Sequence, residues 1–185
     1  MHENEGMKFD FLVIGASGMQ GKIVSRDLLE KDYRVLLTDI QKEGSLKLLE
    51  KFPKANFRYA DNRKLFSLAS IIKQSGAKLV INCAESDWNL NVYKACLLAG
   101  TSVIDLDSAI PTTEKQLALS PRFRKQGLTA ITGCGSTPGI NNVMLSYAAR
   151  QFDTLESVDV GFAWDSNIKK FVVPFSVGSI LWEFT

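Results

Sequence analysis

The stretch that decides the fold is Phe9-Asp-Phe-Leu-Val-Ile-Gly-Ala-Ser-Gly-Met-Gln-Gly21. It runs from an apolar segment into three glycines, Gly15, Gly18 and Gly21, and an amphipathic helical pattern begins directly after them. An apolar run without alternation is typical of a strand that is covered on both faces of its sheet. A strand, a glycine-rich turn and a helix N-terminus in this order predict a Rossmann unit that holds the pyrophosphate of a dinucleotide.

The same rhythm of strand and helix continues outward from this stretch. The predicted strands are residues 8–14, 33–39, 56–60, 78–82, 102–106 and 128–132. The predicted helices are residues 19–31, 45–52, 64–74, 90–98, 113–126 and 140–152, and Pro121 must break or restart the fifth of them. This alternation predicts an α/β fold, a Rossmann-type doubly wound parallel sheet with right-handed crossovers.

The pattern changes after residue 152. Residues 155–164 alternate as a strand, 171–175 are extended, and 176–184 look like the start of a helix. We therefore expect a polar tail at 1–7, the dinucleotide-binding domain at 8–152, and at 153–185 the start of an α+β second domain. Its apolar end has no covering layer, which favours a truncated chain or burial by a second copy; packing back on the first domain is the alternative.

Composition excludes several classes of function. The net charge is +2 and the basic residues are interspersed with acids, so we expect no nucleic-acid partner. No apolar run approaches the roughly 20 residues that span a bilayer, and the N-terminus is polar, so we expect a cytoplasmic protein without a membrane partner. The three cysteines lack CxxC spacing and the only histidine is His2, so we expect neither a metal site nor histidine catalysis.

The first turn has the spacing G-x-x-G-x-x-G, and Ser17 stands where the commoner fingerprint has its second glycine. Gly15 permits the tight turn, Gly18 lets the backbone approach phosphate, and Gly21 lets the helix pack closely on the strand. The following helix offers free N–H groups and a partial positive charge to the pyrophosphate. The alternative is a glycine-rich turn without a ligand.

Asp39 ends the second predicted strand, where a carboxylate would accept hydrogen bonds from the adenosine ribose. An aspartate repels a 2′-phosphate and the next residue, Ile40, supplies no arginine, so NAD is favoured as cofactor. Lys42 leaves NADP open, because its ammonium would neutralise a phosphate. The alternative for Asp39 is an ordinary turn or N-cap aspartate.

Other candidates follow the later strands. Asp61 is predicted near the adenine, with a solvated helix N-cap as the alternative. The Asn82–Ala84 turn, which contains Cys83, is expected beside the middle of the cofactor, and one of Asp105 and Asp107 should face the cleft. Cys134 is a weak candidate for catalysis in the second glycine-rich loop. The predicted cofactor-binding set is Gly15, Ser17, Gly18, Met19, Gln20, Gly21, Asp39, Ile40, Asp61, Asn82, Cys83, Ala84 and Gly135.

The chain resembles the saccharopine dehydrogenase-like family of NAD(P)-dependent oxidoreductases of amino-acid metabolism. The resemblance rests on GASGMQGKIV (15–24), VINCAESDWNLNVYKACLLAGTSVIDLD (80–107), GLTAITGCGSTPGINNVMLSYAA (127–149) and VPFSVGSILWEFT (173–185). It implies hydride transfer that oxidises or forms a secondary amine joining two amino-acid skeletons, as in the lysine-related compound saccharopine. It also implies an amino-acid-type small-molecule substrate, and it implies that residues 153–185 begin a second domain that binds the substrate and builds a homodimer.

Two other classes of function stay in view. One is a non-catalytic NAD(P)-binding regulatory module that presents residues 155–184 to a partner. The other is a short-chain-type dehydrogenase or epimerase, whose first turn has the same spacing. That family requires a Tyr-x-x-x-Lys pair, and no tyrosine of this chain has a lysine four positions later.

Overall fold

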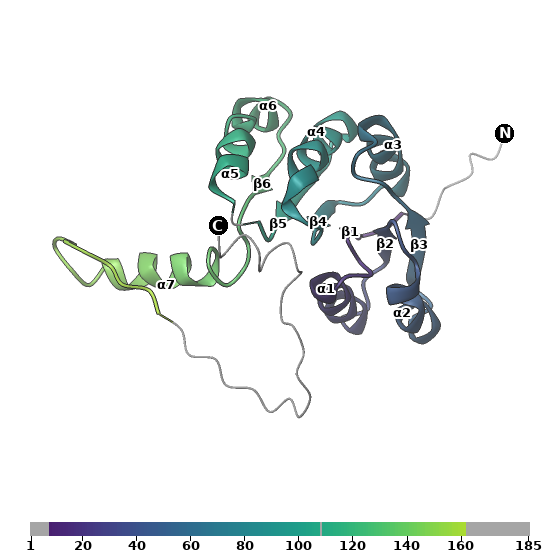
Figure 1. Cartoon of the computed structure of the whole chain (residues 1–185), viewed down its shortest axis with the longest axis horizontal. Helices are drawn as coiled ribbons and strands as arrows, with labels where there is room; N and C mark the ends of the chain where they lie inside the picture. The colour runs from purple at the N-terminus through teal and green to yellow at the C-terminus, as the bar shows by residue number, and fades with distance from the viewer. Residues whose placement is uncertain (1–7, 108, 162–185) are drawn as a thin grey trace. The chain divides into compact units, whose positions relative to one another are not determined.

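The computed structural model describes residues 8–107 and 109–161. Six parallel strands form one sheet in the order β3-β2-β1-β4-β5-β6 (Figure 1). The strands are β1 (Phe11–Ile14), β2 (Val35–Asp39), β3 (Ala55–Tyr59), β4 (Leu79–Asn82), β5 (Ser102–Asp105) and β6 (Ala130–Ile131). The predicted Rossmann-type sheet is therefore confirmed, and the strand order reverses between β1 and β4.

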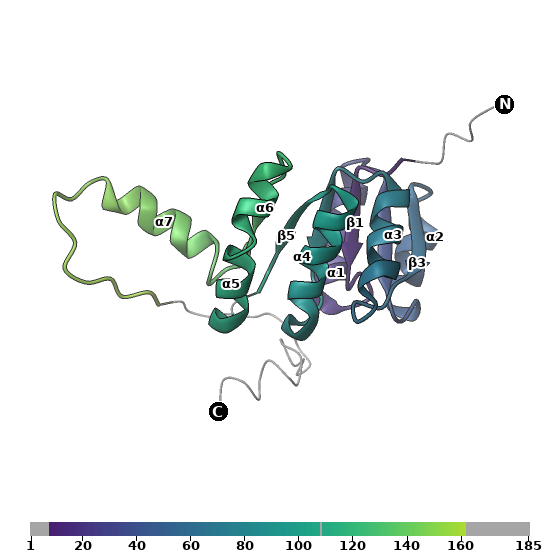
Figure 2. The same cartoon turned by 90° about the horizontal axis from the view of Figure 1, so that it is seen from above.

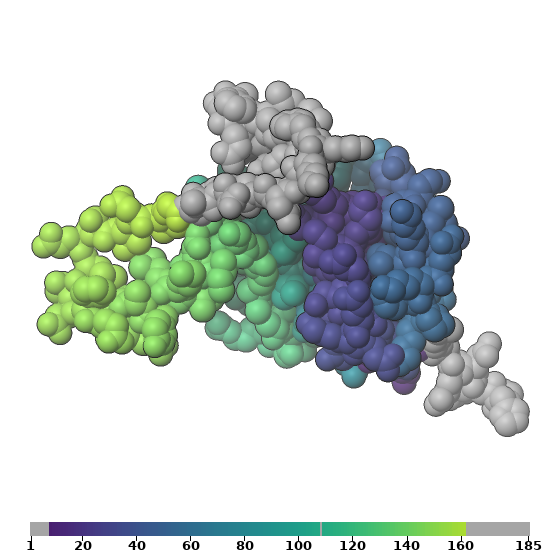
Figure 3. All heavy atoms as spheres, turned by 90° about the horizontal axis from the view of Figure 1, so that it is seen from below, coloured from purple at the N-terminus to yellow at the C-terminus, as the bar shows by residue number. Residues whose placement is uncertain are grey.

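Helices cover both faces of the sheet, as parallel strands require (Figure 1). One face carries α1 (Met19–Glu30) and α2 (Leu46–Lys51), whose surfaces lie side by side in Figure 3. The other face carries α3 (Leu65–Ser75), α4 (Asn89–Ala99), α5 (Ile110–Leu117) and α6 (Ser120–Lys125), with α4 between α3 and α5 (Figure 2). Two short 3-10 turns, η1 (Glu43–Ser45) and η2 (Ser86–Trp88), precede α2 and α4.

Two hydrophobic cores lie on the two faces of the sheet because side chains alternate along each strand. In β1, Leu12 and Ile14 join the core under α3 and α4, whereas Val13 joins the core under α1 and α2. Leu12, Val13 and Ile14 are at most 2% exposed, which explains why the stretch reads as an unbroken apolar run.

The predicted helix at 113–126 is two helices. Pro111 lies in the first turn of α5 and lets that helix begin earlier than predicted, at Ile110. Pro121 lies in the first turn of α6, so it restarts a helix instead of interrupting one. The last strand is also shorter than predicted, because only Ala130 and Ile131 pair with β5.

The last described helix, α7 (Ile140–Ala149), ends before the predicted Phe152. Backbone contacts divide the chain into one unit at 1–151 and another at 152–185. Within the predicted strand 155–164, the described residues 155–161 have no regular secondary structure, so that part of the prediction is wrong. Val158 and Val160 are 46% and 54% exposed, and alternation alone does not make a strand without a partner strand to pair with. The predicted elements at 171–175 and 176–184, and the tail at 1–7, lie outside the described residues.

Candidate functional site

The carboxyl ends of β1, β2, β4 and β5 bring most of the predicted residues to one edge of the sheet. The turn after β1 touches the turn after β4 directly: a Cβ atom on Gly15 would lie 2.8 Å from the backbone nitrogen of Ala84. The Cys83 N–H donates to the carbonyl of Ile14 at 2.9 Å. The edge therefore has the position at which doubly wound sheets bind dinucleotides, where the strand order reverses.

The start of α1 is open to a ligand. Gly18 is its N-cap, and no side chain caps the helix. Met19 and Gln20 are exposed and lie in the first turn of the helix, where the backbone N–H groups have no intrahelical acceptor. An uncapped 12-residue helix offers an anion both these donors and the positive end of its dipole. The geometry fits the pyrophosphate of a dinucleotide.

Gly21 and Gly15 hold this turn against the helix. A Cβ atom on Gly21 would overlap the carbonyl oxygen of Gly15, so only glycine fits there. Gly15 itself has a φ of +73°, in the region that glycine adopts readily. Close packing of helix on strand thus explains the first and third glycines of the pattern.

Asp39 lies beside the glycine-rich turn, as predicted. One carboxylate oxygen accepts the Ser17 N–H at 2.9 Å, and the other accepts the Gln41 N–H at 3.1 Å. The carboxylate therefore closes the turn, which agrees with the alternative role of a turn aspartate; its contact with an adenosine ribose stays a prediction. Ile40 follows it and is 55% exposed.

A link between the first turn and the segment after β2 was absent from the sequence prediction. The Ser17 hydroxyl donates to the Gln41 carbonyl at 2.5 Å and lies 2.8 Å from the Ser45 hydroxyl. The backbone of Gly44 packs against Ser17 so closely that a Cβ atom at Gly44 would overlap the Ser17 carbonyl. Ser17 therefore replaces the usual second glycine with a side chain that ties two loops of the site together.

Asp61 follows β3 next to the end of β2, where the Ala60 N–H donates to the carbonyl of Asp39 at 3.0 Å. Asp61 is buried and forms a two-pronged ion pair with the Arg63 guanidinium, and its carboxylate accepts the Arg63 N–H as well. These hydrogen bonds lower the pKa of Asp61 to about 2. The alternative role of Asp61 as a solvated helix N-cap is wrong, because Lys64 occupies that position in α3.

A chain of buried polar side chains runs behind the edge from β4 to the segment after β5. The Asn82 amide donates to the Asn89 side chain at 2.7 Å, and the Asn89 amide donates to Asp107 at 2.9 Å. The Ser86 hydroxyl donates to the same carboxylate at 2.6 Å. Asn82 and Asn89 are each 1% exposed, so these groups orient the Asn82–Ala84 turn without contact with water.

Asp105 is the centre of a second buried cluster. Its carboxylate accepts the Tyr93 hydroxyl at 2.6 Å, the Gln116 amide at 2.8 Å and the Gly133 N–H at 3.0 Å. The Asp107 N–H donates to it as well. Burial and the Asp105 carboxylate raise the pKa of Tyr93, so its phenol keeps its proton at neutral pH. Asp105 and Asp107 are both buried, so the expectation that one of them faces an open cleft is wrong.

Asn89, Tyr93 and Gln116 were missed by the sequence prediction. A signal for two of them was present: Asn89 and Tyr93 are spaced by four in a helix whose other inward residues are apolar. Polar groups on such a face require buried partners. Nothing in the pattern of residues indicated that the partners are Asp107 and Asp105.

The second glycine-rich loop, residues 133–139, is joined to the end of β5. The Cys134 N–H donates to the Asp105 carbonyl at 2.7 Å, and the Gly135 N–H donates to the Pro138 carbonyl at 3.0 Å. Burial raises the pKa of Cys134, and so does the charge of Asp105, which argues against a reactive thiolate. Burial raises the pKa of Cys83 to about 12, so that thiol is inert too. Catalysis by Cys134 stays a prediction.

Neither a metal cluster nor a membrane-spanning helix is found in the described part of the chain. Within residues 8–107 and 109–161, no three His, Cys, Asp or Glu side chains lie close enough together to hold a metal ion. In the same ranges no helix combines the length and the apolar character needed to cross a membrane.

Comparison with known proteins agrees with this geometry. Carboxynorspermidine synthase of Vibrio alginolyticus is 29% identical over 136 residues, which are 68% of this chain and 32% of that protein. Carboxyaminopropylagmatine dehydrogenase of Synechocystis sp. is 25% identical over 159 residues, 80% of this chain and 40% of that protein. This chain thus spans well under half the length of these relatives.

A solved structure shows the same fold. Apo saccharopine dehydrogenase (L-Glu forming) from Saccharomyces cerevisiae superposes with a TM-score of 0.66 and 20% identity, covering 77% of this chain and 31% of that one. The family model of the saccharopine dehydrogenase NADP binding domain matches residues 11–131, which include every strand of the sheet. The chain therefore belongs to the saccharopine dehydrogenase NADP-binding domain family.

Proposed function

We propose that this chain is the cofactor-binding part of an NAD(P)-dependent oxidoreductase that forms or oxidises a secondary amine by hydride transfer. Family membership supports the cofactor class. The names of two relatives, carboxynorspermidine synthase and carboxyaminopropylagmatine dehydrogenase, support an amine as substrate. Because the chain spans 32% and 40% of those relatives, the reaction is proposed for the protein as a whole.

The observation that carries this proposal is the uncapped N-terminus of α1 at the carboxyl ends of β1 and β4, where the strand order reverses. The N–H groups of Met19 and Gln20 would bind the pyrophosphate, and Asp39 would accept the ribose hydroxyls. The Asn82–Ala84 turn would line the nicotinamide half. NAD(P) supplies the hydride chemistry when bound. In the oxidative direction, the amine carbon would give a hydride to the oxidised nicotinamide and the nitrogen would release a proton, and water would then hydrolyse the imine to a carbonyl compound and an amine.

We also propose that NAD is preferred over NADP, because the Asp39 carboxylate would repel a 2′-phosphate. Lys42 is the cation that would oppose this preference, but its ammonium lies 5.9 Å from the centre of the Phe57 ring, on the side of β3. Titrations of NADH and NADPH by nicotinamide fluorescence test the preference. We expect tighter NADH binding by the wild type and a loss of that preference in Asp39→Ala. Asp27→Ala is the control, since Asp27 is an exposed aspartate on α1 that pairs with Lys31. Tighter NADPH binding by the wild type would refute the preference.

The reaction itself is tested by adding NADH or NADPH with candidate amino and keto acids and following nicotinamide absorbance. Consumption of the reduced cofactor that requires both an amine and a carbonyl compound supports the proposal. Cofactor binding without turnover, in a protein that includes any downstream sequence of the reading frame, would favour the regulatory module instead. Loss of turnover in Cys134→Ser would support a catalytic role for that thiol, and normal turnover would exclude this role.

We further propose that the protein is a cytoplasmic homodimer acting in amino-acid metabolism. An exposed apolar face on α7 supports the dimer, because a second copy would cover it. It consists of residues that are between 53% and 72% exposed, Ile140, Val143, Met144 and Tyr147. Light scattering of the purified chain measures the mass in solution, and cell fractionation measures the location. A monomer at micromolar concentration would contradict the dimer.

A further inference from the structure

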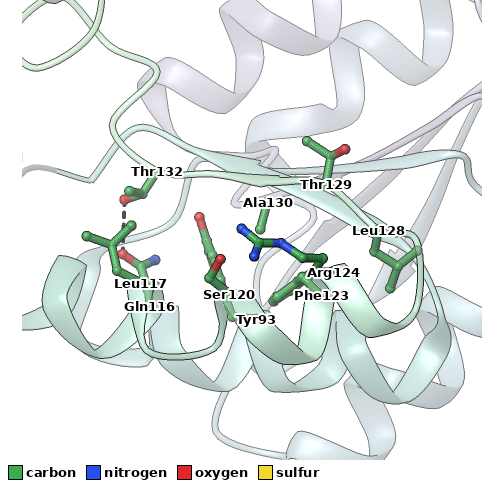
Figure 4. Close-up of a pocket in the computed structure, with 10 residues that line it drawn as sticks. All are labelled: Tyr93, Gln116, Leu117, Ser120, Phe123, Arg124, Leu128, Thr129, Ala130 and Thr132. Atoms are coloured by element: carbon green, nitrogen blue, oxygen red, sulfur yellow. Dashed lines mark hydrogen bonds between the residues drawn. The ribbon is translucent and has the colours of Figure 1, made fainter.

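Polar side chains join elements of the sheet at more than one place. One cluster surrounds Asp105 and is buried, and within it the Thr132 hydroxyl donates to the Gln116 side chain at 3.0 Å (Figure 4). Another cluster surrounds Asp39, which is half-buried at the carboxyl end of β2. Because Asp39 is the carboxylate that we propose for the adenosine ribose, the second cluster bears on the choice of cofactor.

The Asp39 carboxylate is held from both sides. One oxygen accepts the Ser17 N–H at 2.9 Å, and the other accepts the Gln41 N–H at 3.1 Å. The Ser17 hydroxyl in turn donates to the Gln41 carbonyl at 2.5 Å. These three hydrogen bonds form a closed ring from Ser17 through Asp39 and Gln41 back to Ser17. The carboxylate cannot turn away from the glycine-rich turn without breaking the ring.

Packing holds the segment after Asp39 in the same place. A Cβ atom on Gly44 would lie 2.2 Å from the Ser17 carbonyl oxygen, so the two backbones are in direct contact. The Ser45 N–H donates to the Lys42 carbonyl at 2.9 Å, which makes residues 42–45 a tight turn. The Ser45 hydroxyl is buried and lies 2.8 Å from the Ser17 hydroxyl. Ser17 is therefore the residue to which the whole segment 41–45 is attached.

A fixed carboxylate discriminates between the two cofactors. Each oxygen of an ionised carboxylate accepts about two hydrogen bonds, so each Asp39 oxygen has room for a ribose hydroxyl besides its backbone donor. A 2′-phosphate instead brings negative charge, and Asp39 would have to turn away to admit it. The ring prevents that rotation.

We propose that Ser17 is a positioning residue for the choice of cofactor: its hydroxyl fixes the Asp39 carboxylate where it accepts ribose hydroxyls and excludes a 2′-phosphate. This inference rests on the proposed cofactor site and adds to it a residue that sets selectivity through Asp39. Loss of the Ser17 hydroxyl should therefore improve binding of a 2′-phosphate without abolishing binding of NADH.

Competition against NADH fluorescence on the whole chain tests this inference. The probes are adenosine 5′-monophosphate and adenosine 2′,5′-bisphosphate, which differ only in the 2′-phosphate. We expect the wild type to bind the monophosphate more tightly. Ser17→Ala should reduce the ratio of the two dissociation constants by roughly threefold to tenfold, the effect of losing one hydrogen bond. Ser45→Ala is the matched control, because it removes the hydroxyl beside Ser17 but leaves the ring intact, so the ratio should stay that of the wild type.

Two further variants keep the test independent of folding defects. Ser17→Gly places there the glycine of the commoner fingerprint and should give the same shift as Ser17→Ala. In the Asp39→Ala background, Ser17→Ala should change the ratio no further, because Ser17 acts through Asp39.

Three results would each overturn the proposal: an unchanged ratio in both Ser17 variants, equal changes in Ser17→Ala and Ser45→Ala, or the same effect of Ser17→Ala with and without Asp39. A wild type that binds neither NADH nor the monophosphate would refute the proposed cofactor site and this inference together. Normal NADH binding with an unchanged ratio refutes this inference alone, so the two failures are distinguishable.

Discussion

Gly21 shows how one absent side chain shapes the cofactor turn. A Cβ atom at this position would overlap the Gly15 carbonyl oxygen and lie 2.7 Å from the Gly15 carbonyl carbon. We expect Gly21→Ala to push α1 away from β1, to lower the free energy of unfolding by about 1–3 kcal/mol, and to abolish NADH binding. Urea unfolding and fluorescence titration measure the two effects.

The control for this variant is Gly127→Ala. Gly127 has a φ of +66°, but a Cβ atom on it would meet no other atom within 4 Å, so only backbone strain opposes alanine. We expect a cost of about 1–2 kcal/mol and unchanged cofactor binding. Equal cofactor binding in the two variants would show that the close approach at Gly21 is unimportant.

The Tyr93 hydroxyl is a second position where one atom matters. Tyr93 is 2% exposed, and its hydroxyl donates to the buried Asp105 carboxylate at 2.6 Å. We expect Tyr93→Phe to lower the free energy of unfolding by about 1–3 kcal/mol, because the carboxylate loses a donor that water cannot replace. Urea unfolding gives the value. Tyr147→Phe is the control, since Tyr147 is 72% exposed, and a change there equal to that at Tyr93 would contradict the argument.

At the scale of elements, Asp10 joins the starts of three strands. Its carboxylate accepts both the backbone N–H and the guanidinium of Arg34 before β2, and Lys78 before β4 lies 3.5 Å away. Hydrogen bonds from Arg34 are the main reason that the pKa of Asp10 is lowered to about 2. The charged form of Asp10 is therefore part of what holds β1, β2 and β4 in register.

This lowered pKa sets the sign of a pH dependence. The unfolded chain has the ordinary aspartate pKa of about 3.9, so the stabilisation is complete above that value and is lost as the pH falls toward the folded value of about 2. We expect Asp10→Asn to be less stable than the wild type at pH 6 and to lose less stability between pH 5 and 2. Urea unfolding at several pH values measures this, and parallel pH profiles would contradict it.

Most elements could be predicted because their causes are local. Residues 11–14 form a buried strand and 65–75 an amphipathic helix because neighbouring residues repeat with the period of each structure. The division of the fifth predicted helix depended on Pro111 and Pro121, whose position within the first turn is known only once the helix starts are known. Alternation at 155–161 did not produce a strand, because pairing requires a second strand from elsewhere in the chain.

At the scale of the whole molecule, cofactor binding and folding are linked. The proposed cofactor site joins the turns after β1, β2 and β4, so it exists only when the sheet is formed. We expect NADH at 100 times its dissociation constant to add about 2.7 kcal/mol to the free energy of unfolding. The same amount of NADH should leave the free energy of unfolding of Gly21→Ala unchanged. Thermal unfolding with and without NADH measures the shift, and an equal shift in both proteins would place the cofactor elsewhere.

The sequence by itself determined the sheet class, the glycine-rich turn and the place of Asp39, because each depends on residue types within one strand, turn or helix start. Only the tertiary structure decided which polar groups meet. Asp105 binds Tyr93, Gln116 and Gly133 from positions 11 to 28 residues away, and Ser17 binds Ser45 across 28 residues. These contacts arise from parallel strands whose ends converge at one edge. Local periodicity does not indicate which donors meet which carboxylate when the strand ends converge.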